Sequence, residues 1–266
     1  MSLAQTPIKD PLVRARASYN ASQYDQAIDA ATEARLVAKY ANDATLVLAR
    51  ARLGRFRVAL AKGEQAPADL VTARDLLKQI DVEKLSPRDQ IEYLTGVGVA
   101  LYLEDPAGGL PLYGAAAEVF ERALSKSSGA GQDVREPLFE WWASSLDRQA
   151  QLVSDSERRA LYVRILERAE QELDRRDLSP SATYWIAAAS RGADDVERAW
   201  GAAVAGWIRA PQMGSAAARL REDLDRLVMT GIVPDRARLM SSPGNARAME
   251  IVLQQQWDDL KAKWAK

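Results

Sequence analysis

Hydrophobic and polar residues alternate along most of the chain with the period of amphipathic α-helices. Two such segments, 10–20 and 25–40, are joined by the short turn 21–23. Breakers rich in Gly, Pro and Ser separate the later segments, and Ser-Pro pairs mark helix starts near residues 87 and 180. The pattern predicts an all-α protein, with further helices at 44–60, 87–103, 136–153 and 181–189.

Small residues recur on one face of the second helix in each predicted pair. Ala27, Ala31 and Ala34 share such a face, and comparable spacings of small or apolar residues begin at 66, 116, 161 and 199. The segment 17–28, ASYNASQYDQAI, resembles a tetratricopeptide repeat, in which Tyr24 would fill the junction between two closely packed helices. This resemblance implies a right-handed α-α superhelix of about five helix pairs over residues 10–210.

The pairing pattern stops after residue 210. A charged helix is expected at 216–230, then a break at 231–234, a short helix at 234–240 and a final helix at 245–264. The open end of a superhelix must be covered, so we expect residues 211–266 to form a C-terminal helical cap. The competing interpretation is a docking helix through which the protein self-associates, as a weak homodimer. The apolar stripe of the final helix consists of Met249, Leu253, Trp257, Leu260 and Trp264.

The composition removes most catalytic chemistries. The chain has no His and no Cys, so it cannot build a thiolate nucleophile, a Ser-His-Asp triad, a His-metal cluster or an iron–sulfur site. The closest carboxylate pairs are explained by helix capping and solvated faces, and the Gly-rich segments lack the Lys-Ser/Thr of a phosphate loop. We expect no enzyme activity, no cofactor and no metal, the alternative being a carboxylate-based enzyme using Asp194, Asp195, Asp223 and Asp225.

The net charge and the N-terminal segment give expectations about binding partners and cellular location. Thirty-six basic and thirty-seven acidic residues leave a net charge of −1, which gives no reason to expect nucleic acid as a partner. No apolar run is long enough to span a membrane. Residues 1–9 are expected to be disordered or processed, since Ala4-Gln5 resembles the end left by signal-peptide cleavage. That predicts a periplasmic or exported protein, with a cytoplasmic location as the alternative.

A loose loop is expected at 125–132, where small polar residues favour disorder and a boundary between two groups of repeats. A second local expectation concerns the adjacent Trp141 and Trp142, whose side chains point about 100° apart on a helix. Trp142, like Trp185, is expected to fill the core. Trp141 or Trp142 is therefore expected to be at least half exposed.

The function expected from this architecture is a non-catalytic protein- or peptide-binding scaffold, because first helices of stacked pairs line a concave face. The carboxylate clamp of some tetratricopeptide proteins is not matched, since Leu12 and Arg16 stand where its Lys and Asn would be. Arg and aromatic residues are enriched at binding hot spots. On the first helices, the candidate contact residues are Arg16, Tyr19, Asn20, Arg50, Arg57, Tyr93, Trp141, Arg148 and Tyr184.

Overall fold

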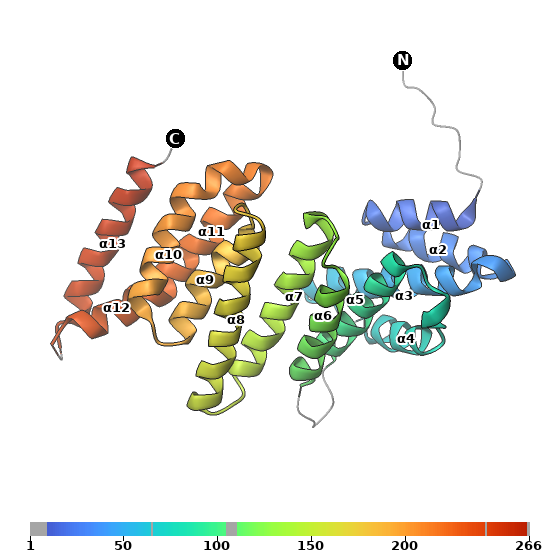
Figure 1. The fold of residues 1–266 in the computed structure, drawn as a ribbon, viewed down its shortest axis with the longest axis horizontal. Coiled ribbons are helices and arrows are strands. Elements are labelled where there is room, and N and C mark those ends of the chain that lie inside the picture. Colours follow the sequence, from blue (N-terminus) through green and yellow to red (C-terminus); the bar gives the residue numbers. More distant parts are fainter. Residues whose placement is uncertain (1–9, 65, 105–110, 243, 265–266) are drawn as a thin grey trace, which may run out of the picture. The chain divides into compact units, whose positions relative to one another are not determined.

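The computed structural model describes residues 10–64, 66–104, 111–242 and 244–264, and all regular structure in these ranges is helical (Figure 1). The predicted all-α class is confirmed. The chain divides into two compact units, and the boundary in the sequence lies between Trp142 and Ala143. No helix within these ranges is both long enough and apolar enough to cross a membrane. The prediction that residues 1–9 are disordered or processed concerns residues that lie outside these ranges.

The first unit is built from helices that pack mostly with their neighbours in sequence. Each of the contacts α1–α2, α2–α3, α3–α4, α4–α5 and α5–α6 is made, and α3 also contacts α1 and α5. The first helices of neighbouring pairs therefore touch one another directly. The elements are α1 (Pro11–Asn20), α2 (Tyr24–Arg35), η1 (Ala38–Tyr40), α3 (Ala41–Ala61), α4 (Pro67–Lys78), η2 (Val82–Lys84), α5 (Pro87–Leu103), α6 (Tyr113–Lys126) and the first part of α7 (Gln132–Ala150).

The second unit contains the rest of α7 and all later helices. The pairs α8–α9, α9–α10 and α12–α13 pack together, and α11 contacts both α9 and α10. Its elements are α8 (Asp155–Arg175), α9 (Pro180–Gly192), α10 (Val196–Arg209), η3 (Ala210–Ala216), α11 (Ala217–Leu227), the π-helical turn η4 (Val228–Ile232), α12 (Val233–Met240) and α13 (Ala246–Lys263).

Several helix starts are set by local capping, two of them at the Ser-Pro pairs that the sequence predicts. The carboxylate of Asp10 accepts hydrogen bonds from the first backbone N–H groups of α1. Ser86 and Ser179 accept the equivalent bonds at α5 and α9, each followed by proline. A side-chain oxygen at this position satisfies a backbone donor that has no partner inside the helix. Three predicted starts therefore lie where the sequence places them.

Three local expectations are corrected. Helix α2 ends at Arg35 instead of residue 40, because Val37 is extended and the chain turns so that the Tyr40 hydroxyl reaches Asp10 at 2.6 Å. The segment 231–234 does not break the helix: a π-helical turn leads into α12, where Pro234 occupies the first turn and needs no helical N–H partner. The expected loose loop at 125–132 is wrong too, since this segment comprises the end of α6, a short turn and the first residue of α7.

That turn is held by Arg135 of α7, which is buried. Its Nη1 atom donates to the carbonyl oxygen of Leu124 at 3.0 Å and to the hydroxyl of Ser127 at 3.2 Å. A buried guanidinium that satisfies a helix C-terminal carbonyl fixes the connection without apolar side chains. The predicted boundary also moves, because the division between the two units lies inside α7 and not in the turn.

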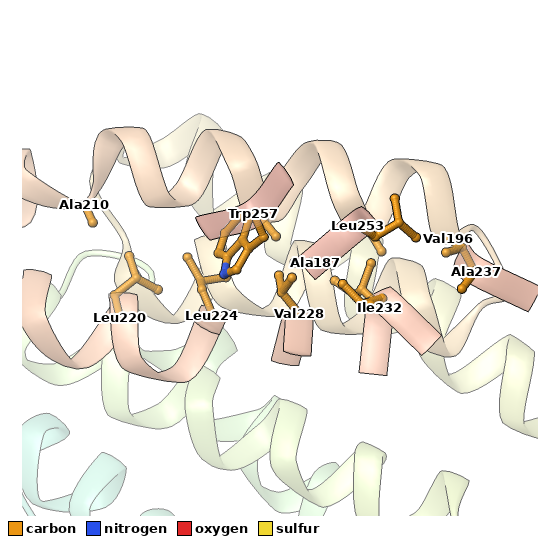
Figure 2. Packing of buried hydrophobic residues seen from close by; sticks show 13 residues of the cluster. Ala187, Val196, Ala210, Leu220, Leu224, Val228, Ile232, Ala237, Leu253 and Trp257 are labelled. Carbon is orange, nitrogen blue, oxygen red and sulfur yellow. The ribbon is translucent and has the colours of Figure 1, made fainter. Parts of the chain in front are cut away.

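The apolar stripe of α13 is part of the core of the second unit. Figure 2 shows Leu253 and Trp257 among Leu220, Leu224 and Ile232. Trp257 is completely buried, and its indole N–H donates to Asp225 of α11 at 2.8 Å. Met249 and Leu260 pack against the same cluster, while Trp264 is 41% exposed. Most of the stripe is therefore covered within the second unit itself, as expected of a helix that closes a core.

Candidate functional site

Three of the predicted contact residues meet where α1, α3 and α5 lie together in the first unit. The guanidinium of Arg50 in α3 lies over the ring of Tyr19 in α1, with Cζ 4.4 Å from the ring centroid, and forms an ion pair with Glu92 of α5. Arg16 of α1 forms an ion pair with Asp89 of α5, with Nη2 and Oδ2 3.1 Å apart. These contacts join three first helices into one face.

Helical spacing explains why α5 supplies both carboxylates. Asp89, Glu92 and Gly96 are separated by three and four residues, so they share one face of the helix. A Cβ atom at Gly96 would lie 3.7 Å from Cγ of Arg50, which places the alkyl stem of Arg50 along this glycine. The small residue lets the arginine stem lie close to α5 while its head reaches Glu92.

A fourth predicted residue, Arg57, lies two helical turns beyond Arg50 on α3. Its Cζ atom is 4.8 Å from the ring centroid of Trp141 in α7. The Trp141 ring stacks on Phe120 of α6, with centroids 5.9 Å apart and planes 11° apart. The edge of Tyr102 in α5 packs against Trp141 at 5.1 Å, and Tyr113 follows at 5.3 Å from Tyr102. We call Arg57 and these four aromatic residues the Arg57 shelf.

The expectation that one residue of the Trp141-Trp142 pair is at least half exposed is wrong. Trp142 is buried, as expected of a core residue, and so is Trp185. Trp141 is only partly exposed, because Phe120, Tyr102 and Arg57 all pack against its ring. The aromatic neighbours come from other helices, so helical geometry within α7 did not reveal them.

The arginines of this face differ in how their charge is balanced. Arg16 and Arg50 are paired with Asp89 and Glu92, and the side chain of Arg50 is only 17% exposed. Arg57 is exposed and forms no ion pair with any residue that the structure describes. Its five N–H donors remain accessible to a ligand. Arg57 is therefore the cation of this face that is best placed to bind an anion.

A second carboxyl group lies near the Arg16–Asp89 pair. Asp43, in the first turn of α3, has its pKa raised by burial and by the neighbouring charge of Asp89, while Arg16 acts in the opposite direction. Asp89 itself is buried and accepts a hydrogen bond from the hydroxyl of Ser86 at 2.7 Å. Because Arg16 and Ser86 already satisfy Asp89, this pair stabilises the packing of α1, α3 and α5.

The remaining predicted residues lie outside these contacts. Asn20 is exposed at the end of α1, and Tyr93 is partly buried in α5. Arg148 and Tyr184 belong to the second unit, where Arg148 is exposed and Tyr184 packs against Trp185 at 5.4 Å and against the core. Sequence reasoning missed Tyr102, Tyr113 and Phe120 of the shelf, although Tyr102 and Tyr113 flank a Gly- and Pro-rich breaker.

The carboxylates considered for catalysis have structural partners. Asp194 pairs with Arg159, and Asp195 caps α10 by accepting from the backbone N–H of Arg198 at 3.1 Å. Asp225 accepts from both Trp257 and Lys261 at 2.8 Å. In the part of the chain that the structure describes, no group of three or more acidic residues is arranged to hold a metal ion.

Comparison with known proteins adds no assignment. No protein-family model matches the sequence, and no curated protein matches it.

Proposed function

We propose that this protein is a non-catalytic scaffold that binds a peptide or protein segment on the face formed by α1, α3, α5 and the part of α7 that belongs to the first unit. We call this surface the first-helix face. Its residues are Arg16, Tyr19, Asn20, Arg50, Arg57, Tyr93 and Trp141, and the ligand contacts would centre on the Arg57 shelf.

The architecture supports this proposal. Sequential helix pairs with direct α1–α3 and α3–α5 contacts are the arrangement expected of a tetratricopeptide-like superhelix. We propose that the helix pairs form such a right-handed superhelix, of which the first-helix face is the concave side. Rigid arrays of this kind present an extended surface without needing a catalytic centre.

The observation that carries the proposal is the exposed guanidinium of Arg57 on a supported tryptophan. Trp141 is held by Phe120 and Tyr102, so the shelf is rigid before any ligand arrives. A preorganised arginine and aromatic surface loses little conformational entropy on binding, and these residue types dominate interface energetics. The ion pairs of Arg16 and Arg50 hold the neighbouring helices in place.

The test is selection from a displayed library of random linear peptides on the purified protein, followed by binding of the selected peptides to two variants. Arg57→Glu reverses a charge on the first-helix face. Arg122→Glu makes the same change on α6, where Arg122 is likewise exposed and without an ion pair among the described residues. We expect Arg57→Glu to weaken binding and Arg122→Glu to leave it unchanged. Failure to select any peptide, or equal loss in both variants, would overturn the proposal.

A further inference from the structure

The charges on the first-helix face indicate which chemical group the ligand carries. We propose that the segment bound at the Arg57 shelf is acidic, with an Asp or Glu side chain paired to Arg57 and a neighbouring apolar side chain against the aromatic residues. This inference rests on the proposed function and names its ligand class.

Arg57 differs from the other two arginines of this face in its charge balance before any ligand binds. Arg16, Arg50 and Arg57 all project from first helices, but only Arg16 and Arg50 have carboxylate partners within the described unit. The fold supplies Asp89 and Glu92 from α5 for those two arginines. For Arg57 the corresponding neighbour is the Trp141 ring, which attracts the cation without occupying its N–H donors. A carboxylate from a bound peptide would give Arg57 the ion pair that Arg16 and Arg50 already have within the fold.

The geometry of the Arg57 guanidinium favours a carboxylate ligand. A guanidinium has a planar fork of donors that matches a carboxylate in a bidentate pair. The contact with Trp141 restricts the orientation of the guanidinium, because the Trp141 ring is itself held by stacking on the completely buried Phe120. Tyr102 and Tyr113 are partly exposed; Tyr102 contacts the Trp141 ring, and Tyr113 contacts Tyr102. A ligand therefore meets one cation next to an aromatic surface.

The charge pattern of this face favours an acidic peptide over other anions. Nucleic acid binding requires a row of cations that neutralise successive phosphates. Here Arg16 and Arg50 are already neutralised, so Arg57 offers a single uncompensated charge on this part of the face. Arg57 also lies on α3, the helix that contacts both α1 and α5, so a bound segment can continue past it in either direction. That position favours an internal acidic side chain over a chain terminus.

The experiment is a double-mutant cycle with a peptide from the library selection. Dissociation constants are measured by isothermal titration for the acidic peptide and for its Asn or Gln counterpart, each against the natural protein, Arg57→Ala and Arg57→Lys. We expect loss of the acidic side chain to weaken binding roughly tenfold with Arg57 present and hardly at all with Arg57→Ala. Arg57→Lys, which keeps the charge without the planar fork, should give an intermediate coupling. Thermal unfolding of each variant checks that the fold is retained.

The outcomes separate the two proposals. Peptides that bind in a manner sensitive to Arg57→Glu but show no enrichment in Asp or Glu would overturn the acidic ligand and leave the scaffold function standing. Coupling of Arg57 to the peptide's C-terminal carboxylate, tested with an amidated peptide, would overturn the internal side chain. Arg57-dependent binding of a single-stranded oligonucleotide without any acidic-peptide coupling would overturn the peptide class. Coupling to the side-chain carboxylate supports both proposals.

Discussion

Gly98 of α5 gives a sharp test of the packing in the first unit. A Cβ atom at this position would lie 2.7 Å from both Cε1 and Cζ of Phe120 on α6, well inside van der Waals contact. Phe120 is completely buried and its ring stacks on Trp141, so it cannot move aside without disturbing the shelf. The substitution Gly98→Ala should therefore destabilise the first unit.

The magnitude follows from two opposing effects. Alanine favours a helix interior over glycine by about 1 kcal/mol, whereas overpacking of a well-packed core costs about 1–3 kcal/mol. We expect a net loss of up to about 2 kcal/mol in the free energy of unfolding for Gly98→Ala. Gly96→Ala is the matched control on the same helix, because its Cβ atom would meet only side-chain atoms at van der Waals distance, Cδ2 of Leu77 at 3.4 Å and Cγ of Arg50 at 3.7 Å. That variant should gain up to about 1 kcal/mol.

Urea unfolding monitored by far-ultraviolet circular dichroism measures both changes. The midpoint of the first unit should fall for Gly98→Ala and rise for Gly96→Ala, with unchanged slopes. Combining Gly98→Ala with Phe120→Leu should cost less than the sum of the two single losses, because the smaller side chain relieves the contact with the new Cβ atom. Equal stability of the two alanine variants would refute the close contact between Gly98 and Phe120.

Three further predictions concern the cores and the buried charges. Trp257→Ala removes a completely buried ring and should cost about 3–5 kcal/mol in urea unfolding of the second unit; an unchanged midpoint would exclude α13 from that core. Arg55, which donates to Asp69 at 2.7 Å, holds the pKa of Asp69 below its usual value of 3.8. Its contribution to stability is present above about pH 4 and is lost as the pH falls through the lowered pKa. Asp69→Asn should therefore flatten the acid side of the stability profile, and parallel profiles would contradict this. Burial and the charge of Asp89 raise the pKa of Asp43, so the ionised Asp43 lowers the stability of the folded state at neutral pH. Asp43→Asn should therefore increase the free energy of unfolding at neutral pH, and this gain should shrink on acidification as Asp43 of the natural protein becomes protonated.

Helix starts and faces were predictable because their causes are local. Asp10, Ser86 and Ser179 cap helices through atoms only two or three residues away. The seven-residue spacing of Arg50 and Arg57 likewise fixes their common face whatever lies opposite. Local sequence is sufficient wherever the partner lies within one or two helical turns.

Contacts between distant helices could not be predicted in the same way. The pairing of Arg50 with Glu92, and of Arg57 with Trp141, depends on the register between helices that are separated by long stretches of chain. The continuous helix across 228–240 depends on tertiary packing too, since Gly231 is buried against the side chain of Arg191. From residue type alone, Gly231 and Pro234 are predicted to break the helix, but tertiary packing keeps the chain helical through both positions.

The contact between Gly98 and Phe120 belongs to a set that bears on how the correct helices find one another. Tyr24 of α2 is similarly close to Gly54 of α3, and Tyr162 of α8 to Gly192 of α9. The chain contains forty-seven alanines, so many of its helix faces are nearly interchangeable and could pair in wrong registers. A bulky ring that fits only opposite a residue without a side chain gives such a pair a unique alignment. A slip by one residue would drive the ring into a neighbouring side chain, so these glycines make misalignment between near-identical surfaces costly.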